Sequence, residues 1–231
     1  MVTAPKDQVE RRKALAELER EITSCRSCPR LVEWREKVAR EKRAAYADEE
    51  YWGRPVPGFG DAGARVVVLG LAPAAHGANR TGRFFTGDRS GDFLFGSLHR
   101  TGYADKPVSR YAGDGLRLRR LWISAAVRCA PPRNKPTPTE RDRCLPYAAR
   151  ELALLDVKVI VCLGAFAWDA ALRLHEIRPK PKFSHGAEHE ADSTTFLGCY
   201  HPSQQNTFTG VLTEPMLDAV LLRARELVEE A

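Results

Sequence analysis

One stretch decides the fold: residues 65–94, which read RVVVLGLAPAAHGANRTGRFFTGDRSGDFL. Residues 66–69 are rich in valine and uninterrupted by polar side chains, which predicts a strand covered on both faces, as in a parallel sheet flanked by helices. The loop that follows gathers polar side chains among glycines, and Ser90 can cap a helix that carries Leu94. Because ligands of open α/β sheets bind outside the carboxyl ends of the strands, this loop is predicted to form the active site.

Three further strand signals lie along the chain, at residues 121–127, 157–163 and 194–199. Helical stretches separate the strands, which favours an α/β fold of three layers, αβα, around a central four-stranded and mainly parallel sheet. The predicted helices lie at residues 6–22, 31–45, 139–155 and 165–174, after Ser90, and in a closing segment from Leu217 to Val228.

Local signals refine two of these segments. Thr139 and Asp142 resemble a capping pair for the helix that ends near residue 155. Residues 178–193 are polar and contain proline, so we predict an exposed loop in which His185 and His189 are solvated.

Length, composition and charge limit the possibilities further. With 231 residues, 43% of them hydrophobic, the chain can bury one substantial core. We expect a single domain, residues 1–231, in which residues 1–60 form an N-terminal helical extension. No apolar run of about 18 residues occurs and the N-terminus is charged, so we expect a soluble cytoplasmic protein without a membrane partner. The formal net charge of +6 favours a phosphate-rich partner without identifying one.

Four of the six cysteines suggest a metal centre. Cys25 and Cys28 form a Cys-x-x-Cys pair that can present two thiolates to one metal, and Cys129 and Cys144 can supply two more. Four thiolates suffice for an iron–sulfur cluster or a zinc site, and the residues alone do not choose between them. Disulfides are the alternative, but a cytosolic compartment keeps thiols reduced. Cys162 lies within an apolar strand and is predicted to be a small buried hydrophobe.

A histidine follows the last predicted strand. His201 precedes Pro202, which restricts the local chain and would aim the imidazole from the edge of the sheet. The alternative is a residue that packs at the start of a helix capped by Ser203. Hydrogen-bonding side chains continue through Gln-Gln-Asn206, and such a concentration on a loop favours a binding function, for which phosphate groups would be suitable partners.

Four separated motifs resemble those of the type-B, or family 5, uracil-DNA glycosylases, and they occur in the same order. They are Gly70-Leu-Ala-Pro73, Asn79-Arg-Thr-Gly-Arg-Phe-Phe-Thr-Gly-Asp88, Arg128-Cys-Ala-Pro-Pro-x-Asn-Lys-Pro136 and His201-Pro-Ser-Gln-Gln-Asn206. The four cysteines are similar to the iron–sulfur ligands of family 4 and family 5 enzymes. It is this resemblance, and not the spacing, that implies a [4Fe–4S] cluster held by Cys25, Cys28, Cys129 and Cys144.

The resemblance implies a monofunctional DNA glycosylase of base-excision repair. Such a hydrolase cuts the bond between a damaged base and its deoxyribose and leaves an abasic site. The target base must leave the stack, and negative charge develops on it as the bond lengthens. By similarity, His201 would donate a hydrogen bond to the base oxygen and Phe85 would stack on the flipped base. Gly70, Ala72 and Asn206 would belong to the base-binding site.

Ala72 departs from the best-known uracil-DNA glycosylases, in which a Gly-Gln-Asp-Pro motif supplies an aspartate that orients water. No carboxylate is available here at that point, so another polar group must hold the water. Asn79 is the first choice and Asp88 the alternative. An amide is not a strong general base, so the mechanism should be dissociative. For Asp88, a capping role or an ion pair beside Arg89 is the favoured interpretation.

A second departure concerns specificity. Ala125 stands where family 4 enzymes carry an asparagine that reads the edge of uracil. A pocket without that amide should discriminate less sharply between bases. The expected substrates are uracil, hypoxanthine and ethenocytosine in double- and single-stranded DNA.

Basic residues flank the motif loops and are expected to contact DNA phosphates: Arg80, Arg83, Arg133 and Lys135. The protein is expected to be a monomer that associates with the nucleoid. Two other functions stay open. One is a non-catalytic iron–sulfur DNA-binding protein of the same fold, which the missing aspartate favours. The other is a zinc-stabilised hydrolase that acts on free nucleotides.

Overall fold

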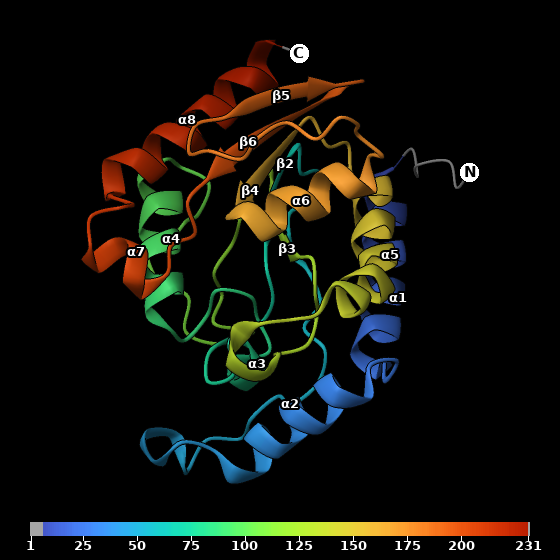
Figure 1. Cartoon of the computed structure of the whole chain (residues 1–231), viewed down its shortest axis with the longest axis vertical. Coiled ribbons are helices and arrows are strands. Elements are labelled where there is room, and N and C mark those ends of the chain that lie inside the picture. The colour runs from blue at the N-terminus through green and yellow to red at the C-terminus, as the bar shows by residue number, and fades with distance from the viewer. Residues whose placement is uncertain (1–6, 231) are drawn as a thin grey trace.

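In the computed structural model, which describes residues 7–230, the four predicted strands pair in parallel at the centre of one sheet (Figure 1). The strands are β1 Phe59–Gly60, β2 Val66–Gly70, β3 Leu121–Ala125, β4 Val159–Leu163, β5 Glu188–Ala191 and β6 Thr194–Cys199. Within the described residues their order in the sheet is β1-β3-β2-β4-β6-β5. The predicted α/β class is therefore confirmed, and the central strands are buried as a parallel sheet requires.

The helices surround this sheet. They are α1 Gln8–Ser24, α2 Pro29–Glu41, α3 Ala78–Thr81, α4 Arg89–Arg100, α5 Pro138–Leu154, α6 Ala165–Leu174, α7 Gln204–Phe208 and α8 Glu214–Glu230, with short 3-10 turns η1 Ala44–Tyr46 and η2 Pro132–Asn134. No helix among residues 7–230 combines the length and the apolar character needed to cross a membrane.

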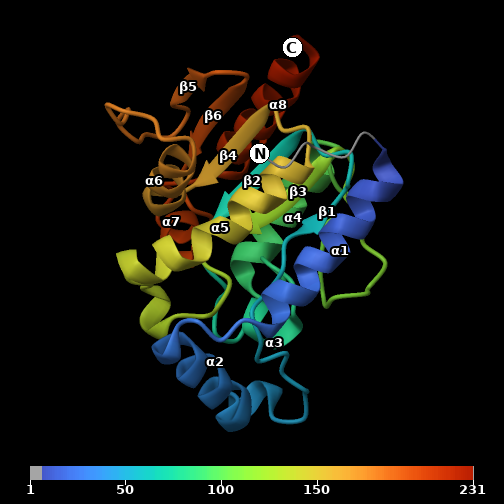
Figure 2. The same ribbon diagram turned by 90° about the vertical axis from the view of Figure 1, so that its right-hand side faces the viewer.

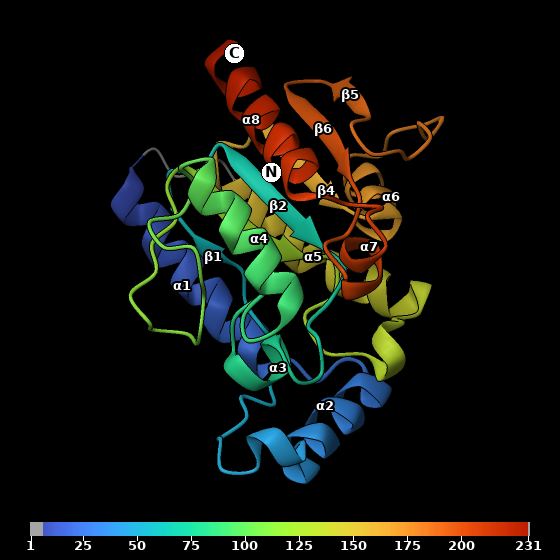
Figure 3. The same cartoon turned by 90° about the vertical axis from the view of Figure 1, so that its left-hand side faces the viewer.

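Alternate residues of β2 separate two hydrophobic cores. Val66 and Val68 pack with α4 and α8 on one face of the sheet, and both helices lie in front of the sheet in Figure 3. Val67 and Leu69 pack with α1, α5 and α6 on the other face, and α1 and α5 lie in front in Figure 2. This alternation follows from the period of two in a strand, and it produces the predicted three layers.

The predicted number of strands is wrong, because the described chain forms six strands and four were expected. The two additional strands, β1 and β5, pair antiparallel at opposite edges of the sheet. β1 has only two residues within a connector rich in glycine and proline. β5 is polar, and its residues alternate between exposed and half-buried, as at a solvated edge. Its hydrophobic signal was therefore too weak to predict.

The segment that was expected to be an exposed loop, residues 178–193, contains β5, and its two histidines contact the sheet. The ring of His189 lies 6.4 Å from that of Phe196, centroid to centroid. His185 Nδ1 accepts a hydrogen bond from the Tyr200 backbone N–H at 3.3 Å. Both side chains therefore have partners instead of being free in solvent.

The start of α5 also differs from the prediction. A capping box joins Thr137 and Glu140, and Pro138 occupies the first turn. Because proline is favoured there, the helix begins just before the predicted pair of Thr139 and Asp142.

The first helix, α1, begins at Gln8 with Asp7 as its cap. Its predicted start at residue 6 lies outside the described residues.

A buried ion pair links the segment after β3 to α5. Arg128 donates to Glu151 from both terminal nitrogens, at 3.0 and 2.6 Å, and both side chains are almost inaccessible to solvent. Glu151 also accepts the Ser124 hydroxyl at 2.7 Å and the Gly58 backbone N–H at 3.0 Å. The carboxylate thus has several donors, which offset the cost of burying its charge.

Glu151→Gln should destabilise the protein by about 3–5 kcal/mol, because it leaves the Arg128 guanidinium buried without a counter-charge. Urea unfolding measures this loss as a lower midpoint. Glu21→Gln is the matched control, an ion pair that also involves α5, since Glu21 of α1 bonds Arg150 of α5 at 2.6 Å and both are about half exposed. That change should cost less than about 1 kcal/mol. Equal losses in the two variants would contradict the role given to burial.

Candidate active site

A cavity of about 550 Å³ lies at the carboxyl ends of β2 and β3. Its walls come from residues 70–74 after β2, from the segment between Phe84 and Ser90, and from the segment between His201 and Gln205. A volume in this range is typical of a small-molecule site. Of the residues predicted from the sequence, the structure brings together Gly70, Ala72, Phe85, Asp88 and His201 at this cavity.

His201 is held on both sides through the main chain. The Asn206 side-chain amide donates to the His201 carbonyl oxygen at 2.9 Å, and the preceding residue, Tyr200, is bonded to His185. Burial lowers the pKa of the His201 imidazole to about 4, so the ring is neutral at pH 7 and carries one N–H. A neutral donor in a cavity can stabilise an oxygen on which negative charge develops.

Asn206 was expected in the base-binding site, but it does not line the cavity. Its side-chain amide donates to the His201 carbonyl oxygen, and its backbone N–H donates to Ser203 Oγ at 3.3 Å. Ser203 caps α7, so the alternative interpretation of this segment as a helix start describes its local structure. Asn206 therefore positions His201, and its neighbours Gln204 and Gln205 face the cavity instead.

Phe85 reaches the cavity from an unusual backbone position. Its φ of 51° lies in the left-handed region, where a bulky residue is strained. Its ring lies 6.0 Å from the His201 ring, centroid to centroid. A Cβ at Gly70 would lie 2.8 Å from Phe85 Cζ, and one at Gly91 would overlap the Phe85 carbonyl oxygen. Two glycines thus permit the position of this side chain.

Asp88 is both a helix cap and a wall of the cavity. Its Oδ1 accepts the Gly91 backbone N–H at 3.0 Å, at the start of α4. Burial raises the pKa of its carboxyl, while hydrogen bonds from the backbone at Gly91 and Ser90 act in the opposite direction. A Cβ at Gly77 would collide with Oδ2. The interpretation of Asp88 as a cap is confirmed, and the same side chain also faces the cavity.

Asn79 does not meet the cavity. It is fully buried on α3, where its Nδ2 donates to the Arg35 carbonyl oxygen at 3.2 Å. The expectation that it holds a water molecule does not fit this position, because its amide is bonded to α2. Asn134 of η2 does line the cavity. Asn134 belongs to the motif that ends at Pro136, but no local signal predicted a role for it, although it follows β3, the strand beside β2.

Two arginines that were expected to contact DNA point inward. Arg80 pairs with Glu49 and donates to the Gly87 carbonyl oxygen at 2.8 Å. Arg83 pairs with Asp114 at 2.7 Å and is also buried. Both hold the loop together, so the expectation of phosphate contacts is wrong for these two.

The other two predicted cations, Arg133 and Lys135, are exposed beside Asn134. Arg89 is exposed at the opposite wall, and its guanidinium lies 5.2 Å from the centroid of the Phe208 ring. Phe208 itself is 68% exposed, which is unusual for a large apolar side chain. Arg89 was considered only as a partner of Asp88, and Phe208 was not predicted, since exposure cannot be read from an isolated aromatic position. The mouth of the cavity therefore combines positive charge with an exposed ring.

The four cysteines of the expected metal centre line one small cavity. Cys25 follows α1, Cys28 caps α2, Cys129 follows β3, and Cys144 lies on α5. The backbone N–H of Arg128 donates to Cys144 Sγ at 3.3 Å. Because all six cysteines, each within the described chain, are free thiols, the structure contradicts the disulfide alternative.

The remaining two cysteines lie in the sheet. Cys162 and Cys199 are fully buried, which confirms the prediction that Cys162 behaves as a small hydrophobe. Burial raises the pKa of Cys199 to about 12 and that of Cys162 still higher, so both are protonated.

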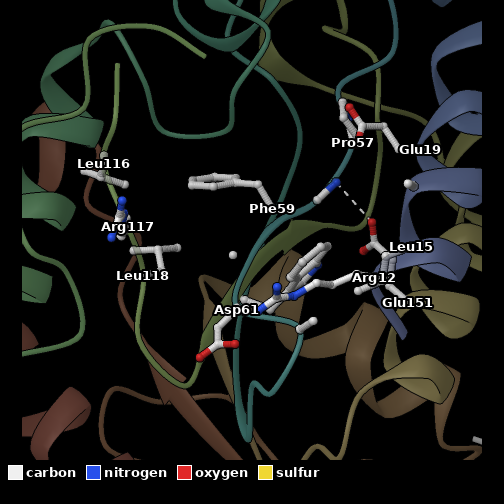
Figure 4. Close-up of a pocket in the computed structure, with 15 residues that line it drawn as sticks. Arg12, Leu15, Glu19, Pro57, Phe59, Asp61, Leu116, Arg117, Leu118 and Glu151 are labelled. Carbon is white, nitrogen blue, oxygen red and sulfur yellow. Dashed lines mark hydrogen bonds between the residues drawn. The ribbon is translucent and has the colours of Figure 1, made fainter. Parts of the chain in front are cut away.

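A second cavity, of about 620 Å³, lies beside β1 and α1 (Figure 4). Of the three carboxylates that line it, two have partners: Glu151 accepts the Gly58 N–H, drawn as a dashed line in Figure 4, and Asp61 accepts the Gly63 N–H at 2.8 Å. The described residues that line it include no histidine. The cavity at the ends of β2 and β3 is therefore the better candidate for catalysis, since it joins a donor, an aromatic ring and a carboxylate.

Comparison with known proteins identifies the family. The family model described as the uracil DNA glycosylase superfamily matches residues 57–224. The chain belongs to the uracil DNA glycosylase superfamily. This assignment confirms the resemblance found in the motifs, and the matched residues include every wall of the candidate cavity.

Similar members of the superfamily cover most of the chain. A type-5 uracil-DNA glycosylase of Mycobacterium tuberculosis is 56% identical over 219 residues, which are 93% of this chain and 82% of that protein. A type-5 enzyme of Thermus thermophilus is 51% identical over 209 residues, 89% of this chain and 94% of the relative. A type-4 enzyme of Archaeoglobus fulgidus is 29% identical over 197 residues, 82% of both chains.

Gly91→Ala should disturb the cavity of this superfamily member, because the new methyl group would overlap the Phe85 carbonyl oxygen. Overpacking against backbone should cost about 1–3 kcal/mol in urea unfolding. Gly96→Ala is the control on the same helix, where the nearest atom is the mobile end of Arg100 at 3.4 Å. Alanine favours a helix by up to about 1 kcal/mol, so the control should keep or gain stability. A Gly91 variant as stable as the control would contradict this account of Phe85.

Proposed function

We propose that the chain is a DNA glycosylase of base-excision repair, which hydrolyses the N-glycosidic bond of uracil in DNA and leaves an abasic site. One observation carries the proposal: His201 and Phe85 line the same cavity at the strand ends. Because burial lowers the pKa of the His201 imidazole, the ring is a neutral donor. An aromatic face suits a flipped base, and the donor suits the oxygen of a departing base anion. Family membership and the relatives named uracil-DNA glycosylase support the same activity.

Leaving-group stabilisation would supply most of the rate. The wall at Ala72 offers only a methyl group, so no carboxylate activates water there. As the glycosidic bond lengthens, the base takes negative charge and the sugar takes positive charge, and His201 would donate to the base oxygen. We assign the water to Asp88 and Asn134, a carboxylate and an amide that line the cavity. Both can orient water that is captured after the bond has broken.

DNA would approach the mouth of this cavity. Arg89, Arg133 and Lys135 are exposed around it and can neutralise phosphates. Phe208 stands exposed beside Arg89 and can fill the space that a flipped base leaves in the stack. The exposed cations and Phe208 fit single-stranded as well as double-stranded DNA, because neither contact requires a complementary strand.

The proposed range of bases is broad, and includes hypoxanthine and ethenocytosine besides uracil. Ala125 lines the cavity and offers no amide that would select one base edge. A site without a fixed amide at this position rejects related bases only weakly. Incubation with matched duplexes tests this point, and removal of uracil with hypoxanthine left intact would contradict it.

We further propose that Cys25, Cys28, Cys129 and Cys144 hold a [4Fe–4S] cluster. In support, their sulfurs line one cavity, and N–H groups of the protein donate to two of them. Among residues 7–230, no group of three or more His, Cys, Asp or Glu is arranged to hold a metal ion, so the choice of a cluster over zinc rests on the motif resemblance. When bound, a cluster would cross-link four segments through thiolate bonds. Iron and acid-labile sulfide in equal amounts would support the cluster, and zinc would contradict it.

We also propose that residues 1–231 act as one domain and as a monomer. The helices of the N-terminal extension are tied to the core, since α1 packs on α5 and Arg30 of α2 bonds Glu140 at 2.6 Å.

His201→Ala should lower the rate of uracil excision by roughly 10²–10³-fold, as the loss of one donor to a developing anion does. The assay incubates a uracil-containing oligonucleotide with the protein, adds alkali and measures strand breakage. His99→Ala, an exposed histidine on α4, is the control and should keep the wild-type rate. DNA affinity should stay unchanged in both variants. A wild-type protein that binds DNA without breaking it would instead favour a non-catalytic binding protein.

A further inference from the structure

Arg35 is a buried cation that has no bonded carboxylate. Its side chain is 2% exposed on α2. Nη1 donates to Cys129 Sγ at 2.9 Å, and Nη2 donates to the Cys25 carbonyl oxygen at 3.2 Å. Among residues 7–230, the one carboxylate within ion-pair range is that of Glu36, at 4.0 Å, and it is bonded to Arg26 at 2.5 Å.

This arrangement favours negative charge at the cysteines. A guanidinium keeps its proton in a protein, and a buried charge is costly unless it is paired. Arg128, which is equally buried, has the carboxylate of Glu151 as its partner. Arg35 has the sulfur of Cys129 in that place. Cysteines bound to metal are thiolates, so a loaded centre would supply the missing counter-charge.

The main chain of Arg35 connects the cysteine site to the base cavity. Its carbonyl oxygen accepts the Asn79 side-chain amide at 3.2 Å, and α2 lies beside α3 in all three views (Figures 1 to 3). Ala78, the residue before Asn79, lines the base cavity. The next residue, Arg80, holds the carbonyl oxygen of Gly87, which precedes Asp88. A short series of hydrogen bonds therefore runs from the sulfur site to the cavity wall.

We propose that Arg35 is a positioning residue with two roles: its guanidinium balances the charge of the loaded four-cysteine centre, and its main chain anchors the wall of the base cavity through Asn79. Loading of the centre holds α2 in place, and α2 in turn holds α3. The inference rests on the proposed metal centre, and it does not require that the cavity excise uracil.

The first test removes the charge from the purified metal-loaded protein. In Arg35→Gln, the reduction potential of the centre should become more negative, because no guanidinium remains to stabilise the added electron. Iron loss to a chelator should become roughly 10–100-fold faster, as for other partners of metal ligands. Arg35→Lys should restore the potential. Arg30→Gln is the control on the same helix, since Arg30 bonds Glu140 instead of sulfur, and it should match the wild type.

The second test removes the hydrogen bond between the Asn79 side chain and the Arg35 carbonyl oxygen, and it leaves the Arg35 guanidinium in place. Asn79→Leu should keep the iron content and the reduction potential, while amide hydrogen exchange rises in residues 73–81. Removing iron from the wild-type protein should raise exchange in the same residues, which tests the coupling even if the variant fails to fold.

Three results would overturn the inference. The first is that Arg35→Gln changes neither the reduction potential nor the rate of iron loss. The others are that amide hydrogen exchange in residues 73–81 stays the same after iron removal, or that the wild-type protein contains no metal. A metal-loaded protein that leaves uracil in place would contradict the proposed function alone. In that case the potential and the exchange rates would still decide the role of Arg35.

Discussion

Parallel pairing of β2 with β3 and β4 is the constraint on which the candidate site depends. It brings the carboxyl ends of these strands to one edge of the sheet, where Gly70 pairs with Ala125. Parallel pairing of β4 with β6 delivers His201 to the same edge, two residues after Cys199. Side chains far apart in the sequence therefore converge there. Glycines permit the closest approaches between the loops that close the cavity.

Buried charged side chains behind this cavity also restrict how its supporting segments pack. Arg128 and Glu151 fasten the segment after β3 to α5, while Arg35 joins α2 to the cysteines and to α3. Burying such groups costs free energy unless each has a partner, so they restrict the ways in which these segments can pack. Arg80 and Arg83 do the same for the loop after β2, which explains why they are not available to DNA.

The sequence was sufficient to predict the central sheet, because its strands are continuous apolar runs that only burial on both faces explains. It was not sufficient for β1 and β5, whose short or polar edges carry no such signal. For the site, residue type and position after a strand predicted His201 and Asp88 at the cavity, and the resemblance to family 5 enzymes predicted Phe85. The same reasoning could not separate Asn79, which is bonded to α2, from Asn134, which lines the cavity. The direction of a side chain depends on neighbours from distant segments, and local patterns do not contain that information.

The central claim is that catalysis comes from stabilising the departing base, with His201 as the donor and without a carboxylate at Ala72. Single-turnover excision of uracil and of 5-fluorouracil by wild type and by His201→Ala tests it most directly. The fluorinated base is a better leaving anion and needs the donor less. The account predicts that the substitution slows uracil release by roughly tenfold more than 5-fluorouracil release. Equal losses with the two bases would contradict it, since His201 would then act on something other than the leaving group.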